Sequence, residues 1–234
     1  MSNKITGCVS FLFLYLTFNS NAQEFNFGLQ CGIGYYNMKD LKELTTHSIN
    51  QQEKIVSNYP PSVYFQPSII FKVSIISFGF LYSYHFTGST ILSKDNSGNR
   101  VDTKINCHAP GIIFGIHPEN ESKIRPSLYC ELGRVFSNLI MDEFSAKGIQ
   151  TNDGYKFIGR CLYFESGLQF SYYIKKYIIG LNGGYFKEFR RENFELKGAL
   201  ENQIKTNHDF YVGNGWDGFR FGLSFTYRLY KSAK

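Results

Sequence analysis

Glu131, Glu165 and Arg220 are the charged residues whose types and spacing could perform chemistry together. Each falls in a segment where polar and apolar residues alternate, and each stands on the polar side near the middle of its segment. Two carboxylates held close together can act as a general acid and a general base. Enclosed charges can instead form a structural ionic plug, because a buried charge must be paired. Which interpretation applies depends on the elements that carry the three residues.

The histidines do not have the spacing of a metal site. The chain has five, at positions 47, 85, 108, 117 and 208, and no two of them lie four apart as on a metal-binding helix. His108 has outward parity near the rim of its strand, where a His and Ser nucleophile pair can act on lipid. The glycine-rich stretches "GLQCGIG" and "LNGGY" precede no helix and are not phosphate loops. We therefore expect no metal and no cofactor.

From Gln23 onward the dominant period of the chain is two, which is typical of strands with one face in each of two environments. Near the C-terminus, for example, Phe219 and Phe221 alternate with Arg220 and Gly222. The alternation predicts eight strands, at about 24–36, 62–72, 75–87, 104–116, 124–138, 156–173, 177–188 and 219–230. The connections alternate in length, beginning and ending with a long one, as in an up-and-down barrel with both termini on the short-turn side.

Side-chain size indicates which face of the barrel is wet. One face carries Gly, Ser, Asn, Gln and a few charges, and the other carries Phe, Leu, Ile and Tyr. The lumen of an eight-stranded barrel is only just wide enough to be filled by side chains, so the large apolar residues would overfill it. We favour a membrane barrel whose outer face contacts hydrocarbon over a soluble ligand carrier with an apolar interior. The predicted fold class is all-β, a closed eight-stranded antiparallel transmembrane barrel, because an open edge in lipid leaves backbone groups unpaired.

The N-terminus has the parts of a cleavable export signal. A short basic start precedes the apolar run "ITGCVSFLFLYLTF", and the small residues Ser20 and Ala22 follow it. This pattern predicts cleavage between Ala22 and Gln23. Residues 1–22 are then a signal peptide and residues 23–234 one barrel domain, placed in the cell outer membrane with both mature termini in the periplasm.

Charge and cysteine positions limit the partners and the disulfides that we expect. The formal net charge is +6, but the basic residues do not cluster with aromatic residues in a stripe, so we expect no nucleic acid partner. Four cysteines follow the predicted cleavage site, and each lies inside a predicted strand at a position that does not oppose another cysteine. We expect them to be free thiols: Cys31, Cys107, Cys130 and Cys161.

The mature chain resembles the outer-membrane β-barrel proteins of the Bacteroidetes type, often called PorT-like, and more distantly the OmpA-type eight-stranded barrels. The resemblance rests on the signal ending "NAQ", on the hairpin "PGIIFGIHPENESKIRPSLYCELGRVF", and on four residues near the C-terminus. Those four, Arg220, Gly222, Phe225 and Tyr227, are similar to the signal read by the barrel assembly machinery. Many such barrels end on the aromatic residue, whereas this chain continues with "RLYKSAK".

Within this frame we favour an ionic plug for Glu131, Glu165 and Arg220, then a gated ion path, then catalysis. The expected function is a non-enzymatic structural or interaction role, with four extracellular loops displayed to a protein partner. The alternatives are a narrow pore or transport and secretion accessory, and a lipid-active outer-membrane enzyme. The expected partners are outer-membrane lipid and, during biogenesis, the barrel assembly machinery.

Overall fold

The computed structural model describes residues 23–39, 41, 54–55, 59–92, 100–118, 122–145, 147–189, 195–196 and 215–231. The predicted signal peptide, including Ala22, lies outside these residues, and Gln23 is the first residue of the first strand. In the described ranges, no helix has the length and hydropathy needed to cross a membrane.

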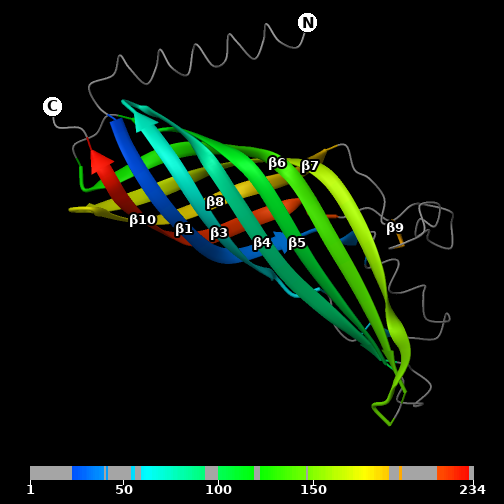
Figure 1. Cartoon of the computed structure of the whole chain (residues 1–234). Coiled ribbons are helices and arrows are strands. Elements are labelled where there is room, and N and C mark those ends of the chain that lie inside the picture. The colour runs from blue at the N-terminus through cyan, green and yellow to red at the C-terminus, as the bar shows by residue number, and fades with distance from the viewer. Residues whose placement is uncertain are drawn as a thin grey trace, which may run out of the picture.

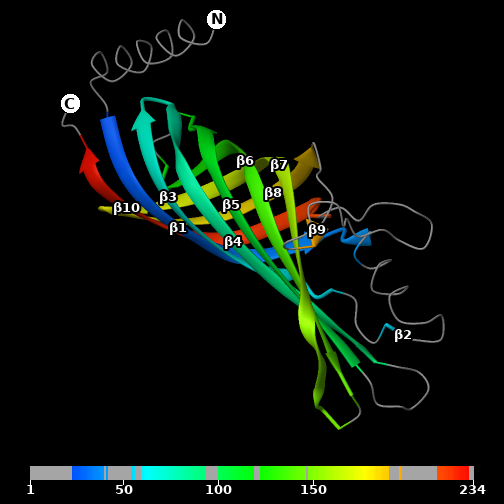
Figure 2. The same cartoon turned by 45° about the vertical axis from the view of Figure 1, so that its right-hand side comes forward.

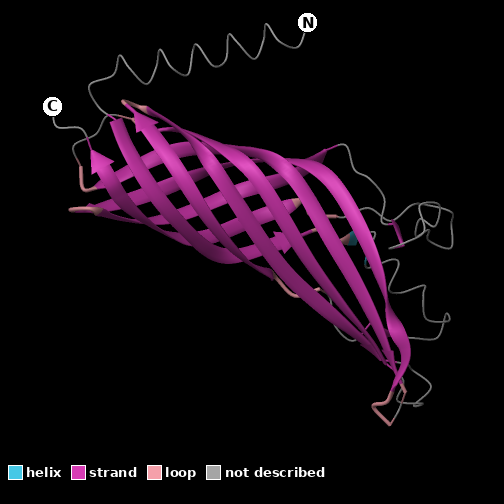
Figure 3. Cartoon of the chain, viewed as in Figure 1, coloured by secondary structure: helices cyan, strands magenta, loops and turns pink. Residues whose placement is uncertain are grey.

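Eight long strands form one closed antiparallel barrel (Figure 1). They are β1 (Gln23–Tyr36), β3 (Ser62–Val73), β4 (Ile76–Leu92), β5 (Arg100–Ile116), β6 (Ile124–Phe144), β7 (Gln150–Ile174), β8 (Tyr177–Phe189) and β10 (Gly218–Lys231). Two short strands, β2 (Lys54–Ile55) and β9 (Glu195–Leu196), pair with β4 and β7. The predicted fold class is confirmed, and strands make up almost all of the described chain (Figure 3).

The barrel closes through the pairing of its first and last strands. The strand order runs β4-β3-β1-β10-β8-β7-β6-β5, and β5 pairs back onto β4. The first and last strands, β1 and β10, pair along almost their whole length. Because every barrel strand has a partner on each side, the barrel leaves no open edge facing lipid.

The short turns lie at the end of the barrel where β1 begins and β10 ends (Figure 2). Two-residue turns join β3 to β4 and β7 to β8. Their first residues, Ser74 and Lys175, have φ values of 54° and 51°. Positive φ at this position lets a two-residue turn match the twist of the flanking strands.

The outer surface carries a wide apolar band, as predicted. Phe80, Leu181 and Phe219 are each more than half exposed, whereas their inward-facing strand neighbours Asn182 and Arg220 are buried. An exposed apolar surface of this extent on every barrel strand is the outer surface of a protein that faces hydrocarbon.

Strands β4 to β7 run farther than predicted on the side opposite the short turns, and project beyond the other barrel strands (Figure 1). On this side the predicted strands reached 87, 104, 138 and 156, whereas the observed strands reach Leu92, Arg100, Phe144 and Gln150. At about 3.3 Å per residue, the six extra residues of β6 add roughly 20 Å. The prediction was short because it relied on outward apolar residues, and the projecting part carries polar ones.

A test of the outward face compares one carboxylate in the apolar band with one above it. Phe225 is outward and exposed in β10, and Asn106 has outward parity in β5, two residues beyond His108 toward the projecting part. We expect Phe225→Asp to lower the free energy of unfolding in vesicles by somewhat less than the ~2–4 kcal/mol that cationic residues cost at mid-depth.

The matched variant Asn106→Asp should retain wild-type stability and heat-modifiable mobility on gels. Equal stability of the two variants would show that the assigned apolar band does not face hydrocarbon.

Candidate functional site in the barrel lumen

The two predicted carboxylates meet inside the barrel. Glu131 of β6 and Glu165 of β7 are direct register partners on adjacent strands, and both side chains point into the lumen. Their exposed fractions are 1% and 0%. Two like charges directly opposite each other destabilise a sheet unless a cation lies between them.

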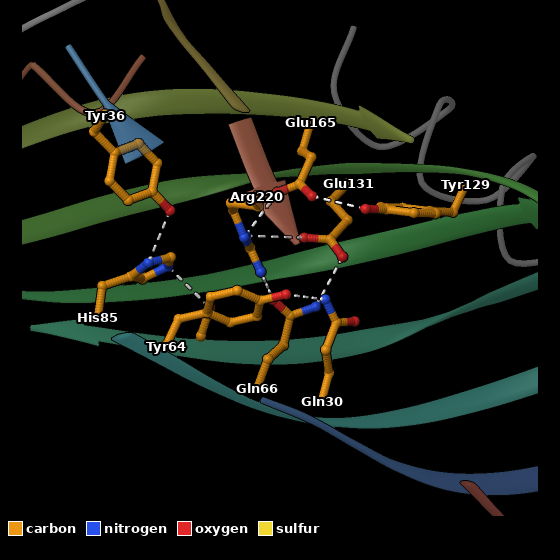
Figure 4. Close-up of polar contacts among 10 residues, drawn as sticks. Gln30, Tyr36, Tyr64, Gln66, His85, Tyr129, Glu131, Glu165 and Arg220 are labelled. Atoms are coloured by element: carbon orange, nitrogen blue, oxygen red, sulfur yellow. Dashed lines mark hydrogen bonds and ion pairs between the residues drawn. The ribbon is translucent and has the colours of Figure 1, made fainter. Parts of the chain in front are cut away.

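Arg220 of β10 supplies that cation (Figure 4). Its Nη1 atom lies 2.6 Å from Glu165 Oε2 and 3.9 Å from Glu131 Oε2. The guanidinium is also 1% exposed. The structure thus brings together all three residues of the predicted plug, with the tighter ion pair between Arg220 and Glu165.

Side chains that the sequence did not single out complete this ionic layer. Arg220 Nη2 donates a hydrogen bond to Gln66 Oε1 at 2.5 Å, and Gln66 Nε2 donates to Glu131 Oε1 at 2.8 Å. Tyr129 Oη donates to Glu165 Oε1 at 2.9 Å. Charge-assisted hydrogen bonds of this kind are among the stronger ones in proteins. The inward parity of Gln66 and Tyr129 was the available signal, but parity alone does not give the pairing across the lumen.

An aromatic ring supports the guanidinium from β3. The Cζ atom of Arg220 lies 4.1 Å from the centroid of Tyr64, a cation–π geometry. The Tyr64 hydroxyl accepts a hydrogen bond from Gln30 Nε2 at 2.6 Å. Through these contacts the layer draws side chains from β1, β3, β6, β7 and β10.

The lumen on the long-loop side of the ionic layer holds a large apolar cluster beside buried polar residues such as Glu188 and Ser137, whereas the sequence predicted a polar interior. Trp216, just before β10, and Met38 and Leu41, after β1, are buried there at 0–2% exposure. Trp216 Nε1 donates a hydrogen bond to Ser137 Oγ at 2.8 Å. These residues form one cluster with inward side chains of four strands, namely Ile105, Cys107, Ala109, Val135, Leu139, Cys161, Tyr163 and Phe186. The sequence signal was a run of inward apolar positions in β5 and β6.

His85 joins the ionic layer to this apolar cluster. Its Nδ1 atom lies 3.1 Å from Tyr36 Oη and its Nε2 atom 2.9 Å from Ser83 Oγ. Its ring stacks on Tyr64 with centroids 5.6 Å apart and lies 5.6 Å from Trp216. Both ring nitrogens therefore have partners, and the ring fills space between the two layers.

Three large inward tyrosines fit because glycines lie beside them. A Cβ atom at Gly167, the register partner of Tyr129, would lie 2.6 Å from Tyr129 Cζ. The same arrangement recurs twice more, with Tyr64 over Gly32 and Gly222, and Tyr163 over Gly133 and Gly111. The glycines make room for side chains in a narrow lumen, as their distribution in the strands suggested.

The remaining predicted chemistry is not assembled in the described residues. His108 faces outward and shares a hydrogen bond with Tyr82, and His47 and His208 lie outside the described residues. Within the described ranges, no group of three or more His, Cys, Asp or Glu side chains could hold a metal ion. The four predicted thiols form no disulfide; Cys31 and Cys130 are on the outward face, and Cys107 and Cys161 are buried in the lumen, where Cys161 Sγ donates a hydrogen bond to Glu188 Oε1 at 3.0 Å.

The four residues compared with an assembly signal divide between the two faces of β10. Arg220 belongs to the ionic layer, and Gly222 faces the lumen opposite Gly32. Phe225 is exposed on the outer face, and the Tyr227 ring packs against Tyr177 there with centroids 5.4 Å apart.

Comparison with known proteins shows a likeness of fold. No family model matches the chain, and no curated protein is similar to it. Among solved structures, a major outer membrane protein from Thermus thermophilus is 11% identical over 88% of this chain and 99% of that chain, with a TM-score of 0.51. The attachment invasion locus protein Ail of Yersinia pestis is 13% identical over 89% and 98%, with a TM-score of 0.42. The outer membrane protease OmpT of Escherichia coli is 10% identical over 89% and 96%, also with a TM-score of 0.42. At these identities only the fold is shared, that of an outer-membrane β-barrel.

Removing the guanidinium should show how strongly the two unneutralised carboxylates destabilise the barrel. We expect Arg220→Ala to lower the free energy of unfolding by about 3–5 kcal/mol, because breaking a buried pair leaves an uncompensated charge. The triple change of Arg220→Ala with Glu131→Gln and Glu165→Gln should recover part of the loss. Urea unfolding in vesicles measures both.

The control is Arg228→Ala, since Arg228 is a partly exposed arginine of the same strand, 4.0 Å from Glu24. It should cost no more than about 1 kcal/mol. If Arg220→Ala proves equally mild, the three charges do not depend on one another.

The two carboxylates should respond differently to neutralisation. Glu165→Gln removes the 2.6 Å ion pair and should destabilise the barrel, whereas Glu131→Gln removes the like charge opposite Glu165 and keeps that ion pair. We expect Glu131→Gln to be neutral or stabilising. Because the two changes are chemically identical and each carboxylate has one further hydrogen-bond donor, their difference in unfolding free energy reports chiefly the contact with Arg220, and the reverse order would contradict the assigned pairing.

Proposed function

We propose that this chain is a non-conducting, non-enzymatic outer-membrane barrel that serves as a structural or interaction protein. The observation that carries the proposal is the filled lumen. Arg220 and Trp216, among the largest side chains in the described chain, are both 1% exposed and stand in successive layers across it. A barrel packed in this way is a rigid support for whatever projects from its rim.

The outer-membrane location is supported by two independent features. The first is the apolar band on the outer face of all eight strands. The second is the fold, which the chain shares with an outer membrane protein at a TM-score of 0.51. We propose that the long-loop side faces outward from the cell and that both mature termini are periplasmic, as in barrels with short periplasmic turns.

The non-enzymatic role is supported by the enclosure of the paired carboxylates. A general acid and base must reach within hydrogen-bond distance of a substrate. Glu131 and Glu165 instead direct their oxygens to Gln66, Tyr129 and Arg220 inside the lumen. The hydrogen-bond partner of His108 Nδ1 is Tyr82, whereas the expected lipid-active pair would use a serine nucleophile.

The projecting ends of β4 to β7 are the part of the described chain that we propose for contact with a protein partner. Long segments on a rigid scaffold commonly carry recognition. Membership of the PorT-like group, and recognition of the C-terminal strand by the barrel assembly machinery, remain proposals on the residues quoted for that resemblance.

Conductance separates a plugged barrel from a narrow pore. In planar bilayers, the refolded wild-type protein should show no steady unitary conductance. The double variant Arg220→Ala with Trp216→Ala removes both layers and should conduct. The matched double variant Arg228→Ala with Phe219→Ala, which changes the same residue classes outside the two layers, should stay closed.

A steady single-channel current from the wild-type protein would overturn the proposal and favour the pore. Hydrolysis of phospholipid by the refolded protein would favour the enzyme.

A further inference from the structure

The outer face of β4 to β7 changes in character within a few residues of each strand. Phe80, Ile112, Leu132 and Phe164 are register partners across the four strands and form an apolar row. Four residues farther toward the projecting ends, the row of register partners is Tyr84, His108, Phe136 and Arg160. Hydrocarbon-facing residues thus give way to aromatic and basic ones, as at the interface of a membrane barrel.

Two arginines occupy neighbouring outward positions on adjacent strands in this transition. Arg160 is the register partner of Phe136, and Arg134 precedes Phe136 by two residues on the same outward face. They are therefore diagonal neighbours on adjacent strands, with backbones about 7–8 Å apart. Both side chains are exposed, and the Cζ atom of Arg134 lies 5.4 Å from the centroid of the Phe136 ring.

Two outward-facing lysines on this side of the barrel are held in ion pairs. Lys104 lies 3.5 Å from Asp142, and Lys187 lies 2.8 Å from Asp217. In the part of the chain that the structure describes, no carboxylate forms an ion pair with Arg160. The carboxylates of this outer face, Asp102 and Asp142, begin only six residues beyond the row that holds His108 and Phe136.

Aromatic side chains with polar atoms occupy the next two strands, β5 and β4. Tyr82 and His108 share a hydrogen bond between Oη and Nδ1, and the rings of Tyr84 and His108 lie 5.0 Å apart. Tyrosine and histidine at a membrane interface place an apolar ring against acyl chains and a polar atom among headgroups.

We propose that these six residues form a headgroup patch that binds the phosphate of a membrane lipid: Tyr82, Tyr84, His108, Arg134, Phe136 and Arg160. The inference rests on the proposed membrane location. A guanidinium matches a phosphate with two parallel hydrogen bonds, and two guanidiniums side by side match one phosphate better than a single one.

The geometry favours a lipid over a protein partner. The patch continues without a break into the apolar row of Phe80, Ile112, Leu132 and Phe164. The ligand of the patch must therefore carry an anionic group that contacts the arginines and a hydrocarbon part that covers the apolar row. A phosphorylated amphiphile has both. A water-soluble protein would meet the guanidiniums but could not cover the apolar row.

The probe is a pair of lipids that differ only in the phosphate. Refolded protein in dodecyl maltoside is mixed with dioleoyl phosphatidic acid or with dioleoylglycerol, and retained lipid is measured by native mass spectrometry. Phosphatidic acid should be retained and dioleoylglycerol should not. Equal retention of the two lipids would overturn the proposal.

The variant is Arg134→Gln with Arg160→Gln, and its control is Lys175→Gln with Lys176→Gln at the opposite, short-turn end, where both lysines are exposed. The two variants lose the same charge. We expect the arginine variant to bind phosphatidic acid at least about tenfold more weakly, which corresponds to about 1.4 kcal/mol, and the lysine variant to bind as the wild type does. Arg134→Lys with Arg160→Lys should bind at an intermediate strength, because the charge remains but the paired donors are lost.

Equal weakening of the arginine and lysine variants would mean that net charge alone attracts the lipid, and would overturn the patch. Insertion of the wild-type protein into phosphatidylcholine vesicles is scored separately. A protein that inserts but does not select the phosphate refutes the patch alone, whereas a protein that does not insert refutes the membrane barrel as well.

Discussion

The burial of one guanidinium is the interaction on which the rest of the lumen depends. Arg220 sits between two carboxylates that face each other from adjacent strands, and it holds both while its other nitrogen engages Gln66. A shift of one residue in β6, β7 or β10 would turn a charged side chain from the lumen to the hydrocarbon, and a shift in β3 would do the same to Gln66. The ionic layer thus ties the register of β3, β6, β7 and β10 together across the barrel, at a point where backbone hydrogen bonds link only neighbouring strands.

The narrow lumen is the second constraint, and glycines make the room that its large side chains need. The lumen of an eight-stranded barrel has room for side chains but not for large ones on every strand. Here a tyrosine on one strand lies over glycines on the next two strands, so that large side chains alternate with glycines around the circumference. The result is a lumen with distinct layers, ionic in the middle and apolar toward the long loops, and its filling supports a barrel that does not conduct.

The fold was predictable from the sequence because its signal is local and repeated. Alternation in single strands, such as Phe219 to Tyr227, gave the outward face, and the inward parity of Glu131, Glu165 and Arg220 gave the members of the ionic layer. The partners Gln66, Tyr64 and Tyr129 were missed because they come from other strands than the charges they contact, at distances set by register, shear and tilt rather than by spacing along the chain. The projecting ends of β4 to β7 were missed because Lys104, Asp142 and their neighbours form a polar outer face, which removes the contrast on which alternation depends.

The position of Arg220 in the last strand has a consequence for biogenesis. Strands β6 and β7 are synthesised before β10, and their hairpin places Glu131 directly opposite Glu165. The guanidinium that neutralises them belongs to the final strand, which also pairs with β1 to close the barrel. Charge neutralisation in the interior and closure of the circumference are therefore one event. A chain truncated before β10 therefore lacks both the strand that closes the wall and the cation that neutralises Glu131 and Glu165.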